Sequence, residues 1–474
     1  MSRTRREFLS ASFSAGTAFG VSAAFSSLSR RLAFGAGDSV SKCELIPVKD
    51  ATTDLPLLRL PEGFRYVSHG WTHDLMSDGT PTPSAHDGMG VIGMDGDIAI
   101  MVRNHEVNGD GTAIPSNRLT PYDSTALSGC TTLRFDVKRG EWTDSRVGLS
   151  GSCRNCAGGI TPWGTWLTCE ETVLGPQSID LNDNKIVRKY TKTHGWIFEV
   201  PADGVSDPVP LTDMGRFKHE AIAIDHETGI VYETEDQNEA GFYRFIPNKP
   251  GGPNRPGDLS AGGTLEMAEV IGHRDLRGAV APGAVFDVRW HKIDDPIRAH
   301  SPLSCEVPDE LGVYYQGKAK GGTTFARLEG CWFGNRSIYF DATKGGGAQA
   351  GQIWRYDPAS SKVTLLFESP AREVLNMPDN LCVNPKGGLI LCEDNDFTAA
   401  EYPQRMFVLT QDGQLQKFAE NNVVLDVEKN TFKGDFRNQE WCGATFSPDG
   451  QWLFVNIQSP GITFAITGPW EDVL

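Results

Sequence analysis

The sequence predicts an all-β fold, a six-bladed β-propeller with an insertion between the third and fourth repeats. Composition is the first observation: 52 Gly and 28 Pro in 474 residues favour many turns over long helices. The second is an internal repeat of six hairpin-like segments that share one plan. The third is their spacing, roughly 50 to 70 residues apart except for one longer interval, which fits blades of four strands.

Each repeat begins with an acidic or thiol residue, turns at Gly, Asn or Asp, and returns through an apolar run to polar or acidic residues. The six copies span residues 87–106, 156–171, 220–236, 329–344, 379–396 and 440–458. Further strand patterns with their own turn signals follow several copies, at 134–140, 196–204, 353–358 and 406–413. Each repeat can therefore form a small antiparallel sheet.

The N-terminus has the pattern of a twin-arginine export signal, because Arg5-Arg6 precedes Phe8-Leu9 and a weakly apolar stretch of small residues. We expect a cleaved signal over about residues 1–36, read by the twin-arginine export machinery, and a periplasmic or extracellular protein. Residues 37–474 are then a single propeller domain, with the insertion at about 247–304. No later segment reaches the roughly 18 apolar residues that span a membrane, so no membrane span is expected.

Charge and cysteine usage narrow the function further. The chain has 44 basic and 61 acidic residues, a balance of −17, which argues against nucleic-acid binding. Ten cysteines in an exported protein favour disulfides. The twin-arginine route, however, moves folded proteins, so a thiolate loaded with metal in the cytosol is compatible with export. Cys153 and Cys156 could form a disulfide or a C-x-x-C chelate.

The repeat also predicts a site, because the first and last residues of a hairpin lie at the same end of its strands. If the first strands line the channel, one mouth gathers Asp87, Cys156, Glu220, Glu329, Asp379 and Glu440. The returning strands add Glu106, Glu170 or Glu171, Glu235, Asp236, Glu393 and Asp394. Confined carboxylates cannot all ionise without cations. Carboxylates suit several calcium ions, whereas the Cys156 thiolate selects a softer ion such as iron or zinc.

Taken one at a time, these acids, histidines and cysteines have simpler interpretations than a metal site. Any one of these acids is more often a turn or rim residue, so the prediction rests on their recurrence at one register. His105 and His219 each precede a repeat acid and could be ligands or hydrogen-bond donors to a ligand; we favour donors. The cysteines in apolar strand patterns are expected to pack inside the blades; they are Cys169, Cys331, Cys382, Cys392 and Cys442.

Seven motifs resemble the PhoX alkaline phosphatases, over a region from about Pro61 to the C-terminus. They are Arg103-Asn-His-Glu106, residues 155–171, Lys218-His-Glu220, Glu235-Asp236, Arg327-Leu-Glu-Gly330, Glu393-Asp394 and residues 446–450. The segment 155–171 is long and specific, whereas the Ser-Pro-Asp-Gly turn in the last motif is common to many propellers.

The resemblance implies an exported phosphomonoesterase that holds a ferric pair, three calcium ions and an oxo bridge in a propeller channel. Cys156 would bridge the irons and Arg327 would contact the substrate phosphate. Glu220 and Glu329 look like iron-site carboxylates. The calcium or bridging ligands would be Glu106, Glu171, Glu235, Asp236 and Asp394, and Glu170 and Glu393 belong to the predicted metal set. This chain is shorter than many PhoX enzymes, and Lys344 could replace a basic residue that the family supplies late in the sequence.

Two other functions fit the same repeat. One is a calcium-dependent propeller lactonase, which would have no use for Cys156; the other is a non-catalytic, calcium-stabilised secreted propeller that binds a partner. No Gly-x-Ser-x-Gly motif is evident, which disfavours serine-hydrolase chemistry. For the phosphatase we expect a small phosphate-ester substrate and a monomer.

Overall fold

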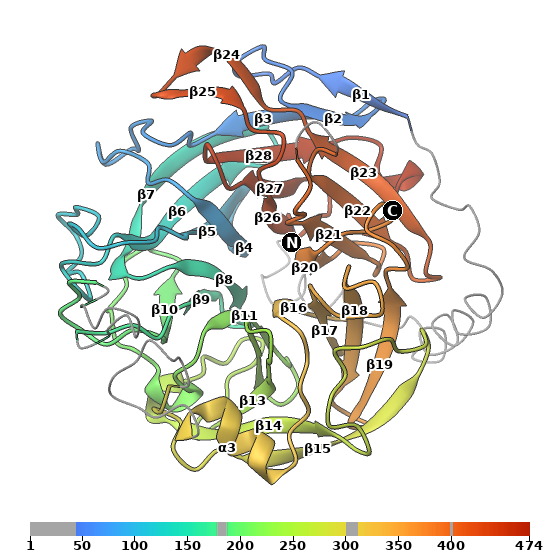
Figure 1. The fold of residues 1–474 in the computed structure, drawn as a ribbon. Helices are drawn as coiled ribbons and strands as arrows, with labels where there is room; N and C mark the ends of the chain where they lie inside the picture. The colour runs from blue at the N-terminus through green and yellow to red at the C-terminus, as the bar shows by residue number, and fades with distance from the viewer. Residues whose placement is uncertain (1–43, 177, 179–185, 187, 300–310, 399–401) are drawn as a thin grey trace, which may run out of the picture.

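The computed structural model describes residues 44–176, 178, 186, 188–299, 311–398 and 402–474, and these residues are mostly β-strand (Figure 1). The expected signal segment, residues 1–36, lies outside the described residues. The helical segments are short: α3 (Val313–Lys320), η1 (Thr212–Met214), η2 (Leu259–Ala261) and η4 (Trp470–Asp472). No helix in the described ranges is long and apolar enough to cross a membrane.

Six hairpins surround one axis, and each begins at a predicted repeat. They are β4 (His86–Asp95) with β5 (Ile98–His105), β8 (Asn155–Ile160) with β9 (Thr165–Glu170), β11 (His219–Ile224) with β12 (Val231–Glu235), β16 (Leu328–Gly334) with β17 (Ser337–Ala342), β20 (Pro378–Val383) with β21 (Leu389–Glu393), and β26 (Trp441–Phe446) with β27 (Leu453–Ile457). Their first strands contact one another in the closed order β4, β8, β11, β16, β20, β26 and back to β4 (Figure 1). The predicted all-β propeller is confirmed.

Further antiparallel strands extend the hairpins outward. They are β6 (Ser128–Asp136), β7 (Glu141–Ser152), β10 (Ile197–Pro201), β13 (Phe242–Pro247), β18 (Gln352–Asp357), β19 (Lys362–Glu368), β22 (Arg405–Leu409), β23 (Leu415–Asn421) and β28 (Ile462–Thr467). The six hairpins do not each have a sheet of their own, because the third and fourth hairpins belong to one nine-stranded sheet made of strands β11 to β19. The number of blades therefore stays a prediction.

The segment expected to be an insertion supplies the strands that join this large sheet. Within 247–304, β14 (Gly263–Val270) pairs with β13, and β15 (Val285–Lys292) pairs with both β14 and β19. The described part of the segment thus extends the outer edge of the sheet. The domain boundaries themselves stay a prediction.

Strands from the N-terminal part of the chain complete the last two sheets. β3 (Arg65–His69) pairs with β28, while β1 (Leu45–Val48) and β2 (Leu58–Pro61) add to β23. The Tyr66 hydroxyl accepts hydrogen bonds from the Leu57 and Leu58 amides at 2.9 and 3.2 Å, and its ring packs edge-on against Phe464. A small hairpin, β24 (Val424–Lys429) with β25 (Phe432–Asp435), lies outside this ring (Figure 1).

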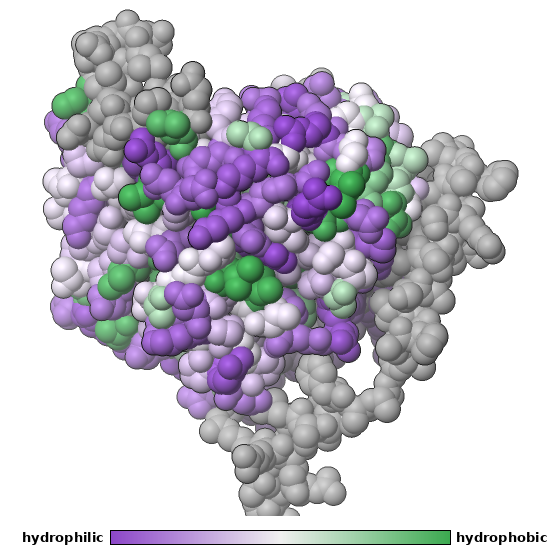
Figure 2. Space-filling model, turned by 90° about the horizontal axis from the view of Figure 1, so that it is seen from below, coloured by the Kyte–Doolittle hydropathy of each residue, from purple (hydrophilic) through white to green (hydrophobic). Residues whose placement is uncertain are grey.

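Apolar side chains fill the space between neighbouring hairpin regions. Phe242 and Phe340, from the third and fourth hairpin regions, stack with ring centroids 4.3 Å apart, and both are buried. On the face shown in Figure 2, hydrophobic residues occur in small groups among polar ones. The apolar surface is thus used mainly to hold sheets together around the axis.

Candidate metal centre

A β-bulge presents the predicted ring residues at the start of five hairpins. In the first hairpin, His86 pairs with His105 and Met89 with Arg103, so Asp87 and Gly88 together oppose Asn104. The same two-against-one register shift contains Cys156, Glu220, Glu329 and Asp379 in their own hairpins. A bulge turns a side chain away from the regular alternation of a strand. These five residues therefore share one backbone position around the axis.

Small residues follow the ring residues and let the strands approach closely. A cavity at the axis is lined by Gly88, Ala157, Ala221, Gly330, Asn380 and Ala444, among others. A side chain on Gly88 would come within 2.5 Å of Ala157, and one on Gly330 within 2.6 Å of the Asp379 carbonyl. The inner strands are thus too close at this level for larger side chains.

Polar side chains of one hairpin hold the bulge of the next. Asn104 donates from Nδ2 to the carbonyls of Cys156 and Ala157 at 2.9 and 2.7 Å. Thr234 donates to the Glu329 carbonyl at 2.6 Å, and Asn456 donates to the Asp87 carbonyl at 2.6 Å. Each of the three stands two residues before the polar end of its returning strand. The position of a ring residue is therefore fixed by its neighbouring hairpin.

The sixth hairpin places Cys442 rather than Glu440 at the ring register. Cys442 pairs with Asn456, and its Sγ donates to the carbonyl of His86, the residue before Asp87, at 3.0 Å. In the same way Cys156 Sγ donates to the carbonyl of His219, the residue before Glu220, at 3.2 Å. The two cysteines are equivalent in the repeat, and each is followed by two small residues. That shared pattern is the signal in the sequence that could have identified Cys442.

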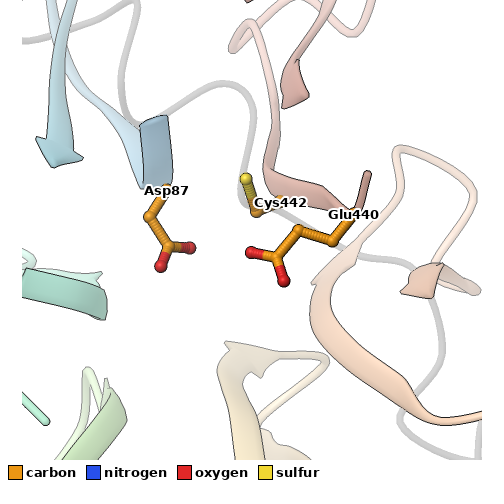
Figure 3. Close-up of side chains that lie close together, drawn as sticks. All are labelled: Asp87, Glu440 and Cys442. Carbon is orange, nitrogen blue, oxygen red and sulfur yellow. The ribbon is translucent and has the colours of Figure 1, made fainter. Parts of the chain in front are cut away.

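Our expectation that Cys442 packs inside a blade is wrong. Asp87, Glu440 and Cys442 offer ligand atoms that all lie within 4.8 Å of one another, and their side chains meet at the channel mouth (Figure 3). The other four cysteines of that group lie in apolar core clusters, as predicted; they are Cys169, Cys331, Cys382 and Cys392.

Two further groups consist of carboxylates alone. Glu220, Glu329 and Asp379 form one, and Asp379 also forms a group with Asp394 and Glu440; within each group the ligand oxygens are again at most 4.8 Å apart. Burial and then the neighbouring Asp394 raise the pKa of Asp379 to about 7. Burial, followed by Glu329 and Asp379, raises the pKa of Glu220 well above its usual value. Such crowded oxygens fit a hard cation such as calcium, which would let them ionise.

Two arginines clamp the remaining mouth carboxylates. Arg327 donates from Nε and Nη2 to Asp236 at 2.7 and 3.0 Å, and Nη2 also lies 2.7 Å from Glu329. Arg154 contacts Glu106 through Nε and Nη2 at 3.0 and 2.6 Å, and Glu171 at 2.5 Å. Burial opposes the charge of Arg327, but Glu329 and Asp236 raise its pKa above the usual value. Both arginines remain cationic and partly exposed, and in both Nη1 makes no hydrogen bond among the described residues.

The two clamps share a backbone feature. Arg154 and Arg327 have positive φ angles of 46° and 48°, and each stands two residues before a ring residue. The sequence motifs identified Arg327 but not Arg154. They also left out Gln458, whose Nε2 donates to Glu106 and to Glu440 at 2.7 Å each and so connects the first and sixth hairpins.

Three acids of the predicted metal set make other contacts. Glu170 accepts hydrogen bonds from four donors: the amides of Cys153, Gly195 and Trp196 and His194 Nδ1. Glu393 is paired with Arg405 through two 2.7 Å contacts. Glu235 accepts from the Gly241 amide and the Tyr243 hydroxyl, and burial raises its pKa to about 8. Among the described residues, none of the three belongs to a close ligand group.

Cys156 is a buried free thiol, and so is Cys153, which contacts the Tyr190 hydroxyl at 2.9 Å; the disulfide interpretation is therefore wrong. Burial and then Glu220 raise the pKa of Cys156 well above its usual value. Cys156 is not part of a close group of three ligands within the described ranges. A thiolate there requires a cation that offsets both effects.

The remaining candidates lie outside the ring. His105 bonds to the Ser84 carbonyl and to Thr131, while His219 bonds to the Gly215 carbonyl. Neither imidazole forms a hydrogen bond with a ring carboxylate in the described structure. Lys344 follows β17 and is exposed. The mouth thus combines buried oxygens, two thiols and two clamped cations, a set that can bind metal ions together with an anionic group.

Comparison with known proteins assigns the family. The family "Alkaline phosphatase PhoX" matches residues 44–148 and 144–461. Among curated proteins, no sequence matches this chain. A solved structure of Pseudomonas fluorescens PhoX in complex with vanadate, described as a transition-state analogue, is similar with a TM-score of 0.64 and 20% identity, over 90% of this chain and 97% of that one. A gluconolactonase from Xanthomonas campestris is similar with a TM-score of 0.39 and 13% identity, over 92% of this chain and 99% of that one.

The family match spans nearly all of the described propeller, including both arginine clamps and every ring residue. The resemblance noted in the sequence motifs is confirmed, and with it the enzyme class, a hydrolase of phosphate monoesters. The chain belongs to the PhoX alkaline phosphatase family.

Proposed function

We propose that this PhoX-family phosphatase is an exported enzyme whose channel mouth holds several calcium ions and a ferric pair. The observation that carries the proposal is the group of buried carboxylates at the ring, whose pKa values are raised by burial and by one another. Such a group is costly to keep in an apolar setting unless cations occupy it.

The ligand types suggest how the ions divide. Glu220 and Glu329, which the family resemblance suggested as iron ligands, group with Asp379 and offer only oxygen, so we assign this group to calcium instead. Cys156 and Cys442 occupy equivalent positions, and sulfur prefers a transition ion. When bound, such ions supply Lewis acidity and an activated nucleophile for ester hydrolysis.

The chain itself would bind and orient the phosphoryl group. Arg327 and Arg154 are fixed by carboxylates through Nε and Nη2, so that Nη1 of each can donate to a phosphoryl oxygen. A charge-assisted bond from a prefixed guanidinium is stronger than a neutral one and loses little side-chain entropy. Glu106, Glu171 and Asp236 would then serve both the arginines and the calcium ions, whereas Asp394 would serve the calcium ions.

Activity and elemental content of the exported protein test the proposal together. We expect hydrolysis of p-nitrophenyl phosphate to stop when calcium is removed by a chelator and to return with calcium, and the active protein to contain iron. Full activity after demonstrated calcium loss would contradict the calcium part. An active preparation without a transition metal would contradict the iron part. Gluconolactone serves as the substrate that the lactonase alternative predicts to be hydrolysed.

Export and assembly state need separate tests. Replacing Arg5 and Arg6 by lysine should retain the protein in the cytosol if the twin-arginine machinery reads this segment. Light scattering of the mature protein should give the mass of a monomer.

A further inference from the structure

Arg103 on β5 is a fully buried arginine without a carboxylate partner among the described residues. Its Nη1 donates to Thr463 Oγ1 at 2.7 Å and lies 3.3 Å from His86 Nδ1. Its Nε and Nη2 have no hydrogen-bond partner. By contrast, the buried guanidinium of Arg405 is paired with Glu393. A buried cation that lacks an anion is costly, so the surroundings of Arg103 call for a negative charge.

The polar atoms around Arg103 come from both sides of the place where the ring closes. His86 and Arg103 belong to the first hairpin, Thr463 belongs to β28, and Thr72 follows β3. Two glycines leave room for these atoms. A Cβ on Gly70 would lie 2.9 Å from Arg103 Nη1, and a Cβ on Gly461 would lie 2.1 Å from Thr72 Oγ1 and 3.2 Å from His86 Nε2. We call Arg103, His86, Thr72 and Thr463 the seam pocket.

The unpaired polar atoms of the seam pocket are mainly hydrogen-bond donors. Because Nη1 of an arginine can only donate, His86 Nδ1 must accept, and the imidazole proton is on Nε2. The Pro83 carbonyl lies near enough to affect the pKa of His86, yet Nε2 makes no hydrogen bond of normal geometry. Thr72 Oγ1 is also buried without a partner. The hydroxyl of Thr463 is already used, since it donates to Asn456 Oδ1 at 2.6 Å.

A water molecule fits this set poorly, because it accepts about two hydrogen bonds and must place two protons of its own. The pocket offers several donors and, in Thr72, a single hydroxyl that can accept. The net charge of the seam pocket is also defined by its residues. His69, the nearby imidazole outside the pocket, has its pKa lowered to about 4 by burial and then by Arg103, so it adds no second cation. One guanidinium requires one negative charge.

We propose that the seam pocket binds one small monovalent inorganic anion, such as chloride, which neutralises Arg103 and joins the first hairpin to the ring-closing sheet. The site is distinct from the carboxylate ring, whose residues attract cations. The Cys442 thiol is the other group near Arg103 that could carry a negative charge, but its Sγ lies within 4.8 Å of ligand oxygens of Asp87 and Glu440, so a thiolate there would be neutralised by the cation proposed for the ring. The anion therefore comes from solvent.

Crystals of the metal-loaded mature protein grown in sodium bromide test the proposal directly. We expect an anomalous bromide peak at hydrogen-bond distance from Arg103 Nη2 and Thr72 Oγ1. Ordered water at these atoms, with no anomalous peak, would overturn it. This measurement does not depend on phosphatase activity or on the identity of the metals.

A solution experiment uses thermal unfolding at constant sodium concentration and ionic strength. Replacing gluconate by chloride should raise the Tm of the parent by about 2 to 5 °C, as expected for a ligand that binds only the folded state. Thr72→Val should reduce this shift, and Arg103→Met should abolish it. Arg134→Met, which changes a partly exposed arginine on neighbouring β6, should keep the full shift. An equal Tm in both salts would contradict the proposal, and if Arg103→Met does not fold, the bromide peak and Thr72→Val decide.

Discussion

At the scale of single residues, each mouth arginine is held by two carboxylates, and its Nη1 has no partner in the described part of the chain. Both backbones also adopt a positive φ, as Ala85 and Met377 do at the same position of the repeat, so this conformation belongs to the repeat and the side-chain contacts are what relate the two arginines. The geometry therefore gives Arg154 a role equal to that of Arg327.

Replacement of Arg327 by lysine tests that role. Arg327→Lys keeps the positive charge but cannot span Asp236 and a phosphoryl oxygen together. We expect kcat/KM for phosphate esters to fall by roughly 1.5 to 3 kcal/mol in transition-state stabilisation, with metal content unchanged. Arg336→Lys, at an exposed position, should have no effect. Parent-like kinetics of Arg327→Lys would remove this residue from the substrate site.

The equivalent thiols give a second prediction at this scale. Cys156→Ser and Cys442→Ser each replace a sulfur that can ionise beside a metal by a hydroxyl that hardly ionises, so the ratio of iron to protein should fall while calcium is retained. Cys382→Ser, in an apolar core cluster, should lower stability instead and leave the iron ratio unchanged. Elemental analysis of the three proteins separates these outcomes. Unchanged iron in Cys442→Ser would limit sulfur ligation to Cys156.

At the scale of elements, the loop after β9 is anchored by a buried histidine between two acids. His194 Nδ1 is 2.7 Å from Glu170, and Nε2 is 3.5 Å from Asp123. Burial alone would lower the pKa of His194, but Glu170 and then Asp123 raise it from 6.5 to about 9. The protonated imidazole thus ties the strand end that precedes Glu171 to the loop that carries Asp123.

This anchor predicts a loss of stability at alkaline pH. Because the pKa is higher in the folded protein, its contribution is complete below pH 6.5 and disappears as the pH rises through about 9. The full loss is on the order of 3 kcal/mol, from 1.36 kcal/mol per pKa unit. With saturating calcium, the unfolding free energy of His194→Gln should be lower than that of the parent at pH 6 and should change less between pH 6 and 10. His273→Gln should follow the parent, and parallel curves for His194→Gln would contradict this assignment.

The adjacent acids Glu170 and Glu171 illustrate what the hairpin pattern could predict and what it could not. The hairpin pattern predicted that Glu170 or Glu171 reaches the mouth, but not which, since strand alternation sends neighbours to opposite sides. The choice depends on the bulge at Cys156, which shifts the register by one residue. For the same reason the alignment of the sixth repeat placed Glu440 on the ring, whereas the strand pairing places Cys442 there. Bulges have no strong signal in a single sequence, because contacts between hairpins stabilise them. An example is the pair of hydrogen bonds from Asn104 to the carbonyls of Cys156 and Ala157.

At the scale of the whole molecule, the six recurrent hairpins were predictable because each one has its own period and turn. The nine-stranded sheet was not predictable, since its β15 to β19 contact joins segments whose pairing has no local signal. The ring of acids depends on all six hairpins at once. Cations at the ring should therefore affect the stability of the entire fold.

Calcium removal should make the stability of the fold depend on pH. The pKa values of Glu220, Glu329 and Asp379 are raised in the folded protein, so the stability they allow is complete below pH 4 and is lost as the pH rises, through about 7 in the case of Asp379. Chelator-treated protein should therefore lose Tm steadily between pH 5 and 8. Protein in excess calcium should not, because the ions hold these groups ionised at every pH in this range. Equal slopes in the two conditions would show that the carboxylates are not calcium ligands.

The pairing of β3 with β28 has a consequence for synthesis of the chain. Residues 65 to 69 find their partners only at 463 to 467, so a nascent chain carries β3 unpaired until β28 has been synthesised. Until then β3 is an open sheet edge, which is a template for aggregation. A truncated product that lacks β28 cannot close. Ring closure therefore acts as a test of completeness, since only a chain that includes β28 can cover that edge.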